Sequence, residues 1–170
     1  MKKLVFTLLL ALTFVTAQAQ EIFAASRSNN VDELRKYVSQ KVDINQVNEK
    51  GFTPLILAVY NNASDAVEFL VTNGANINAQ DKSGNNALMG AIFKQNAAMV
   101  NLLIVNKADV NQINFNGASS LIFAATFGKP EIVKSLLKAG ADKSIKDNRG
   151  KTALDHAVMQ ENLEVISLLE

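Results

Sequence analysis

Apolar and polar positions along this chain repeat at a fixed interval of about 33 residues. Four segments share one pattern, in which a small polar residue is followed by apolar residues and then by alanine. They are Thr53–Ala58, Asn86–Ala91, Ser119–Ala124 and Thr152–Ala157. Extending the register backwards aligns Ile22 with Leu55, so a shorter first copy precedes them.

Four columns of the repeat hold apolar residues in every copy. The alanine column is Ala25, Ala58, Ala91, Ala124 and Ala157, and the large apolar column before it is Ile22, Leu55, Leu88, Leu121 and Leu154. Two later columns are Leu34, Val67, Val100, Val133 and Ile166, and Tyr37, Leu70, Leu103, Leu136 and Leu169. Self-similarity at this period, with a Thr-Pro-Leu core, predicts a stack of helical repeats.

Each copy contains signals for two helices. The first helix is expected to begin just after Thr53, Asn86, Ser119 and Thr152, because their side-chain oxygens can accept an orphaned amide of the first turn. The second is expected over Asp65–Asn73, Ala98–Asn106, Glu131–Ala139 and Glu164–Glu170, where apolar residues have helical spacing. Gly74 and Gly140 stand where a left-handed residue would end that helix. Lys41 and Lys107 occupy the same column and predict weaker helix ends.

With these columns in place, the chain resembles the ankyrin-repeat family over residues 22–170. The turn phrase from Asn48 to Leu55 and the loop phrase from Asn73 to Asn78 match that family closely. The chain departs from the family pattern at the position after the large apolar column, where the family favours His. That position holds Phe23, Ile56, Met89, Ile122 and Asp155. The expected fold is an all-α ankyrin-repeat solenoid of about five 33-residue helix-turn-helix units with β-turn-like loops, divided at roughly 20–47, 48–80, 81–113, 114–146 and 147–170.

The first 19 residues have the pattern of a secretory signal peptide. Two lysines are followed by an apolar run from Leu4 to Val15 and by small residues at Ala17 and Ala19. Cleavage after Ala19 would make Gln20 the new N-terminus. Gln20 occupies the same repeat position as the capping residues Thr53, Asn86, Ser119 and Thr152. An uncleaved membrane anchor is the alternative, but the apolar run is short for a spanning helix. We expect a bacterial protein that is periplasmic or secreted and is not inserted stably in a membrane after cleavage.

Charge and cysteine content exclude several kinds of partner and chemistry. The chain has 17 basic and 16 acidic side chains, and removal of residues 1–19 takes away two lysines. The remaining balance of 15 to 16 gives no sign of a nucleic-acid surface. Because there is no cysteine, a disulfide, a thiolate nucleophile and a lipobox lipid anchor are all excluded.

Candidate catalytic and metal-binding groups are few, and each has a structural explanation. Asp155 and His156 are adjacent on a helix and therefore do not face each other as a general-base dyad. The hydroxyls of Ser119 and Ser120 are explained by helix capping. The Asn and Asp residues near Asn76 and Asp109 recur at the repeat period and lack the twelfth-position Glu of a calcium loop, so turn roles are expected for them. We predict no catalytic residue, cofactor or metal, and no enzyme.

The resemblance implies that a partner protein is held by the loop tips and the concave face of the first helices. Carried onto this chain, the candidate partner-binding residues are Phe52, Tyr60, Phe93, Lys94, Phe115, Phe127, Arg149 and Met159. Five of these are aromatic, and aromatic residues are common anchors of protein interfaces. The alternative is that Phe52 and Phe115 fold over neighbouring loops and that Phe93 fills a groove between helices.

Two classes of function remain open from the sequence. The first is an exported monomeric binding module, acting as an inhibitor or immunity-type partner or as a stabiliser of a periplasmic enzyme. The second is a self-associating structural protein or a component of an envelope complex. A hydrolase is a weaker third hypothesis, since it depends on Asp155 and His156 alone.

Overall fold

Paired helices stack side by side along the whole described chain. The computed structural model describes residues 20–127 and 129–170, and the predicted signal peptide lies outside them. The described part of the chain opens with a helical segment at residues 20–27. The elements that follow are α2 (Val31–Ser39), α3 (Pro54–Tyr60), α4 (Ser64–Thr72), α5 (Ala87–Phe93), α6 (Ala97–Val105), α7 (Ser120–Phe127), α8 (Pro130–Lys138), α9 (Ala153–Met159) and α10 (Leu163–Leu169).

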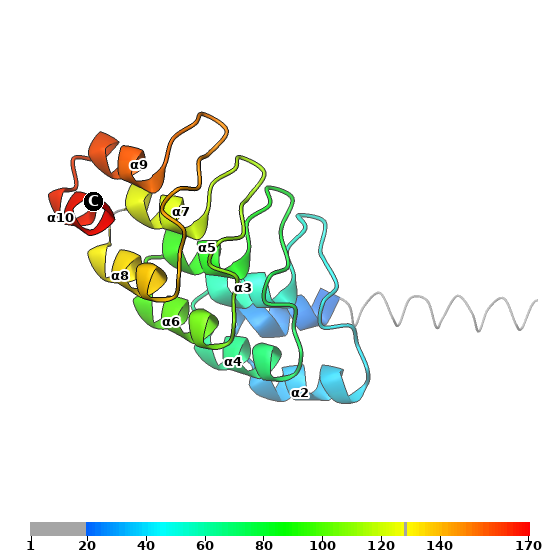
Figure 1. Ribbon diagram of the computed structural model, residues 1–170. Helices are drawn as coiled ribbons and strands as arrows, with labels where there is room; N and C mark the ends of the chain where they lie inside the picture. Colours follow the sequence, from blue (N-terminus) through cyan, green and yellow to red (C-terminus); the bar gives the residue numbers. More distant parts are fainter. Residues whose placement is uncertain (1–19, 128) are drawn as a thin grey trace, which may run out of the picture.

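The helices form two rows, with long loops projecting on one side (Figure 1). Helices α3, α5, α7 and α9 contact one another in sequence and form the first row. The second row contains α2, α4, α6, α8 and α10, and the last four each pack beside the first-row helix of their own repeat (Figure 1). Within the described residues the only β-type pairing is an isolated bridge between Ile113 and Ser119. The predicted all-α repeat solenoid is therefore confirmed.

The first-row helices begin at the caps that the sequence predicts. Thr53 Oγ1 accepts from the Ile56 amide at 3.2 Å, and Pro54 occupies the first helical position, where a missing amide costs nothing. Thr152 caps α9 in the same way, with Asp155 completing a capping box. The prediction for the first copy is wrong, because Gln20 is already helical and is not the residue that precedes the helix.

The second-row helices α4, α6, α8 and α10 start and end one residue earlier than predicted. In α6 and α10 the start is set by a capping asparagine just before the helix. In α6 that residue is Asn96, whose side chain accepts from the Met99 amide at 3.0 Å, so the helix begins at Ala97. At the other end, the backbone of Asn106 is no longer helical, although its amide still donates to carbonyls of α6.

Left-handed backbone closes the second-row helices α2, α4, α6 and α8, as expected. Gly74 and Gly140 both have φ of +88°, a conformation that glycine adopts without steric cost. Lys41 has φ of +60° and Lys107 of +69°, so these two lysines hold the strained conformation predicted for them. A second left-handed position, between the two helices of a repeat, was not predicted. It is held by Asn29, Asn62, Gln95 and Glu161.

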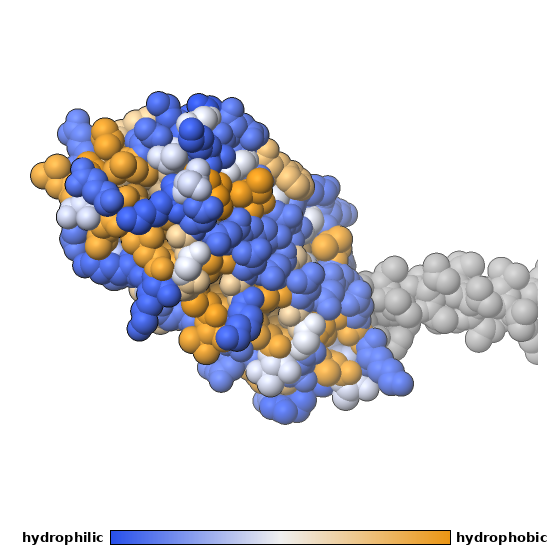
Figure 2. Space-filling model, viewed as in Figure 1, coloured by the Kyte–Doolittle hydropathy of each residue, from blue (hydrophilic) through white to orange (hydrophobic). Residues whose placement is uncertain are grey.

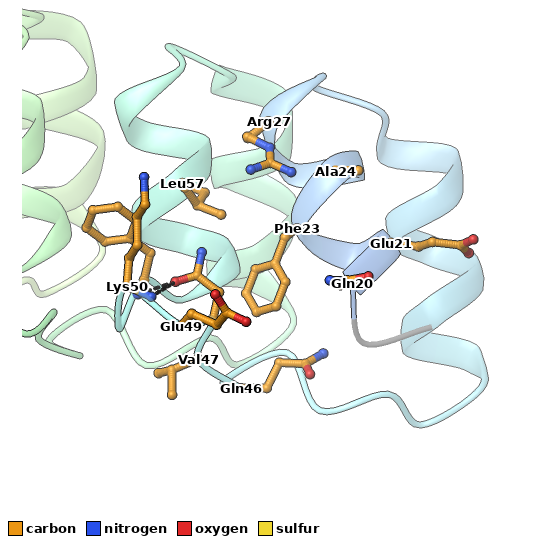
Figure 3. A pocket seen from close by; sticks show the side chains of 12 residues that line it. Gln20, Glu21, Phe23, Ala24, Arg27, Gln46, Val47, Glu49, Lys50 and Leu57 are labelled. Atoms are coloured by element: carbon orange, nitrogen blue, oxygen red, sulfur yellow. Dashed lines mark hydrogen bonds between the residues drawn. The ribbon is translucent and has the colours of Figure 1, made fainter. Parts of the chain in front are cut away.

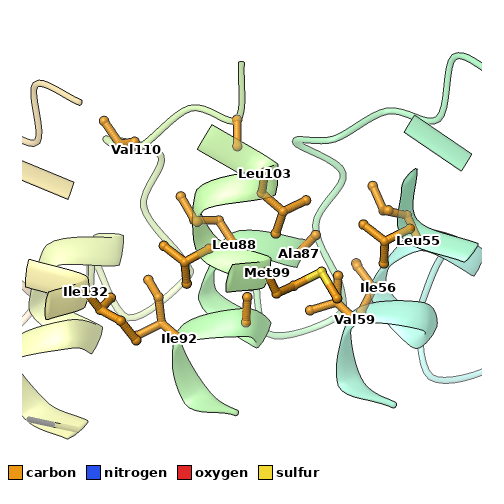
Figure 4. Close-up of a cluster of buried hydrophobic side chains, with 14 of the residues drawn as sticks. Leu55, Ile56, Val59, Ala87, Leu88, Ile92, Met99, Leu103, Val110 and Ile132 are labelled. Atoms are coloured by element: carbon orange, nitrogen blue, oxygen red, sulfur yellow. The ribbon is translucent and has the colours of Figure 1, made fainter. Parts of the chain in front are cut away.

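The core is one continuous row of apolar side chains from successive repeats (Figure 4). The alanine column is buried in every copy, and Ala91 has no exposed surface. The three large apolar columns are buried in the first four repeats. In the last copy Leu154 and Ile166 are only half-buried, because no further repeat of the described chain covers α9 and α10.

Asn and Asp side chains shape the long loops. The side-chain oxygens of Asn48, Asp81, Asn114 and Asp147 each accept from backbone amides two and four residues later. A second set links neighbouring repeats, since Asn78 Oδ1 accepts from the Asp109 amide and Asn111 Oδ1 from the Asp142 amide. These oxygens bind the protein's own amides, which is the turn role predicted for them.

Candidate functional site

The predicted partner-binding residues gather on one surface, here called the concave face. It consists of the helical segment 20–27, helices α3, α5, α7 and α9, and the loop residues 46–53, 79–86, 112–119 and 145–152 that lead into these four helices. Tyr60, Phe93, Lys94, Phe127 and Met159 lie at or next to the C-terminal ends of the first-row helices, and Phe52, Phe115 and Arg149 lie on the loops. Two hollows open on the same face.

Three phenylalanines from α5 and α7 form an aromatic cluster. The rings of Phe93 and Phe127 meet edge to face, with centroids 5.3 Å apart and planes at 89°. Phe123 joins them, with its centroid 5.8 Å from that of Phe127. Phe93 is 52% exposed and Phe127 is 37% exposed. A cluster that is packed on one side and open to solvent on the other suits an interface anchor.

Phe52 and Tyr60 are more deeply packed. Their ring centroids are 5.7 Å apart, and both side chains lie against the core as half-buried residues. The Tyr60 ring packs over Gly90, where even a Cβ would make only an ordinary van der Waals contact at 3.5 Å. Burial raises the pKa of the Tyr60 hydroxyl, and the nearby charge of Asp81 adds to this shift. Packing within the stack accounts for most of the surface of these two side chains.

Phe115 lies over the neighbouring loop yet keeps a large open surface. Its amide donates to the Ser83 carbonyl at 3.1 Å, and a Cβ on Gly84 would lie 2.7 Å from the Phe115 ring. The ring therefore sits on Gly84, whose φ of +78° also favours glycine. Because Phe115 remains 67% exposed, it can pack over the loop and still contact a partner.

The last two predicted residues lie toward the C-terminal end of the stack. Arg149 reaches Asp147 at 3.4 Å while its side chain stays 74% exposed. Met159 is 53% exposed, and its neighbours Val158 and Leu163 are exposed as well. Apolar surface gathers over α9 and α10 in the space-filling view (Figure 2). These residues are open because no repeat packs beyond them in the described chain.

A hollow of about 380 Å³ opens between α7, α9 and their loops. Its lining includes Phe123 and Phe127 of the aromatic cluster, Arg149 and the chain's single histidine. His156 is buried, with Nε2 2.9 Å from Asp147 Oδ2 and Nδ1 3.2 Å from Thr126 Oγ1. Neither of these two contacts is predictable from the sequence, because they join three elements that only the stack brings together.

This histidine network ties two repeats together. The Thr126 hydroxyl donates to the Ile122 carbonyl at 2.8 Å, so its proton is used within α7. The Lys151 amide first, and then the His156 side chain, the Arg149 amide and the Arg149 charge, lower the pKa of Asp147 to about 2, against an opposing effect of burial. Asp155 turns away to accept from the Thr152 amide and hydroxyl, both at 2.8 Å. The arrangement fixes α7, α9 and a loop to each other.

A larger hollow of about 700 Å³ lies at the N-terminal end of the concave face (Figure 3). It is lined by the helical segment 20–27, the loop that precedes α3 and Leu57 of α3. Phe23 and Phe52 contribute aromatic surface, while Arg27, Glu49 and Lys50 contribute charge. The two hollows thus lie toward opposite ends of the concave face, with α5 between them.

Neither a metal centre nor a membrane-spanning helix is evident in the part of the chain that the structure describes. Across residues 20–127 and 129–170, no three His, Asp or Glu side chains are grouped as metal ligands. No helix in the same ranges is long and apolar enough to cross a bilayer.

Comparison with known proteins agrees with the repeat geometry. The family model of ankyrin repeats in three copies matches residues 22–114 and 93–170. A stretch of 35 residues is 54% identical to the E3 ubiquitin-protein ligase hecd-1 of Caenorhabditis elegans; it makes up 21% of this chain and 1% of that ligase. The chain thus spans only a small part of this relative. The family match, the 33-residue columns and the two rows of helices together show that the chain belongs to the ankyrin-repeat family.

Proposed function

We propose that this protein is an exported binding module that holds a partner protein on its concave face. Ankyrin repeats are generally protein-protein interaction modules. The observation that carries the proposal for this chain is the aromatic cluster, in which Phe93 and Phe127 pack against each other while 52% and 37% of their surfaces stay open. Aromatic side chains that are already ordered lose little entropy on binding.

Export is supported by the sequence of residues 1–19. The basic start, the short apolar run and the small residues Ala17 and Ala19 together fit a cleavable signal peptide. The mature protein would begin at Gln20, and the intact mass of the protein from the native envelope fraction tests this. Retention of Lys2 and Lys3 in that material would refute cleavage.

Two roles fit an exported binding module. It would act as an inhibitor or immunity-type partner of a toxin or enzyme, or as a stabiliser of a periplasmic enzyme. Self-association within an envelope complex is the alternative, and the exposed Val158, Met159 and Leu163 are the observation that favours it. Light scattering during size exclusion separates the two, since a monomeric module gives the mass of one chain at all concentrations.

The deciding experiment is a comparison of three tagged proteins purified from the native envelope fraction. The parent, the double variant Phe93→Ala/Phe127→Ala and the control Lys138→Ala are each analysed by mass spectrometry. Lys138 is exposed on α8, in the second row. A partner that the parent and the control retain and the double variant loses supports binding at the concave face. A partner that all three retain equally contradicts it.

A further inference from the structure

We propose that the partner segment held by the concave face is acidic and carries apolar or aromatic side chains between its carboxylates. This inference rests on the proposed function and specifies its partner. Two observations carry it, namely the separation of charge between the two sides of the stack and the aromatic cluster between exposed lysines.

Cationic side chains are concentrated on the concave side. Its segments, residues 20–28, 46–61, 79–94, 112–127 and 145–160, contain seven Lys or Arg and five Asp or Glu. The rest of the described chain contains eight Lys or Arg and eleven Asp or Glu. The concave side therefore has a positive balance of charge and the rest of the described chain a negative one, although the two nearly cancel.

The carboxylates of the concave side are mostly engaged within the protein. Asp81 and Asp147 are buried, and each accepts two backbone amides of its own loop. Asp155 caps α9, and Glu21 accepts from the Tyr37 hydroxyl at 2.9 Å. Only Glu49, at the N-terminal end, is an exposed carboxylate without such a bond among the described residues. These carboxylates keep their charge, but Lys and Arg outnumber them by five to three in residues 79–94, 112–127 and 145–160, so the balance seen by a partner there is positive.

The cations of the same side are available. Lys50, Lys82, Lys94 and Lys151 are exposed, and among the described residues none of them forms an ion pair within 4.0 Å. Because an exposed lysine that is not held in an internal ion pair can pair with a partner at little cost, such residues favour an acidic ligand.

The apolar anchor lies between these charges. Lys94 directly follows Phe93 at the end of α5, and Lys82 lies on the loop that leads into the same helix. The hollow beside Phe127 presents Phe123 as apolar wall and Arg149 at its rim. A partner segment that inserts an apolar side chain against the cluster would place its flanking carboxylates near the lysines. Burial of the apolar side chain would then supply affinity, and the lysines would select for acidic residues.

A random dodecapeptide phage library provides the probe. It is panned in parallel on the parent, on Lys82→Glu/Lys94→Glu and on the matched control Lys41→Glu/Lys107→Glu. The control makes the same change of net charge at exposed lysines outside the concave segments. We expect the parent and the control to enrich Asp or Glu flanking Phe, Tyr, Trp or Leu, and the concave variant to lose that enrichment. Synthetic copies of the enriched peptides should bind the concave variant roughly tenfold more weakly, with affinity that falls as salt rises.

Several outcomes would overturn the inference. They are enrichment of basic or neutral peptides, equal loss in the control, binding insensitive to salt, or no enrichment at all. An acidic peptide without any apolar residue that binds equally well would remove the role of the aromatic cluster. If the envelope partner is lost from Phe93→Ala/Phe127→Ala but retained by Lys82→Glu/Lys94→Glu, the proposed function stands and the acidic partner does not.

Discussion

Phe93 and Phe127 meet edge to face at 5.3 Å although they belong to different helices of neighbouring repeats. In repeat register Phe127 lies one position later than Phe93, so the two side chains leave their helices in different directions. The rings meet in the edge-to-face arrangement that aromatic pairs favour. The pairing confirms that these two residues lie near each other, whereas their contact with a partner remains a prediction.

Truncation of either ring should affect binding more than folding. For Phe93→Ala and Phe127→Ala we expect a loss of about 2 kcal/mol or more in affinity for the captured partner. Since Phe93 is 52% exposed, its truncation should destabilise far less than the 3 to 5 kcal/mol, roughly, typical of a buried phenylalanine. Calorimetric titration and thermal melting measure the two effects. A sharp fall in melting temperature with unchanged affinity would assign the rings to the core instead.

The alanine column should not tolerate a larger side chain. Ala91 has no exposed surface, so Ala91→Leu must force neighbouring helices apart, at a cost of about 1 to 3 kcal/mol or more. Lys94→Leu, close by on the exposed face, is the matched control and should change little. Equal urea midpoints for the two variants would contradict this packing.

Asp147 should make stability depend on pH in strong acid. Its pKa is lowered to about 2 in the folded protein, from an ordinary value of 3.8. A depressed folded pKa gives stability that is present above about pH 4 and is lost as the pH falls toward 2. Asp147→Asn should flatten this part of the profile, because Asn114 shows that an amide oxygen can accept the same two loop amides. Urea unfolding at pH 2, 3, 4 and 6 compares the two proteins. Parallel profiles would show that Asp147 is not the group responsible.

Lys107→Gly should stabilise the protein. Lys107 has φ of +69°, and a left-handed conformation costs a residue with a Cβ roughly 1 to 2 kcal/mol. Part of this gain is offset by the greater freedom of glycine in the unfolded chain, so a net gain of about 0.5 to 1 kcal/mol is expected. Lys138→Gly, which places glycine in α8, should lower stability instead. A lower urea midpoint for Lys107→Gly would indicate that the Lys107 side chain stabilises the fold through its own contacts.

The sequence by itself determined the repeat, the caps and the core. Each of these features depends on residues close together within one copy, as when Thr53 caps the helix that begins at Pro54. The column that a residue occupies then predicts whether its side chain is buried, in every copy that has a neighbouring repeat on both sides. The exceptions, Leu154 and Ile166, belong to the last copy, where burial depends on a repeat that the described chain does not provide.

Other features were decided by the tertiary structure alone. The contacts of His156 with Asp147 and Thr126 join a loop, α9 and α7, and no local pattern specifies which side chains will meet across two repeats. The division between packed and open aromatics is decided in the same way. Tyr60 lies over Gly90 in α5, the first helix of the next repeat, whereas Phe93 meets Phe127 and stays half exposed. Local spacing fixes the direction of each side chain, but its surroundings depend on the neighbouring repeat, because each repeat of a solenoid buries its surface only against the next.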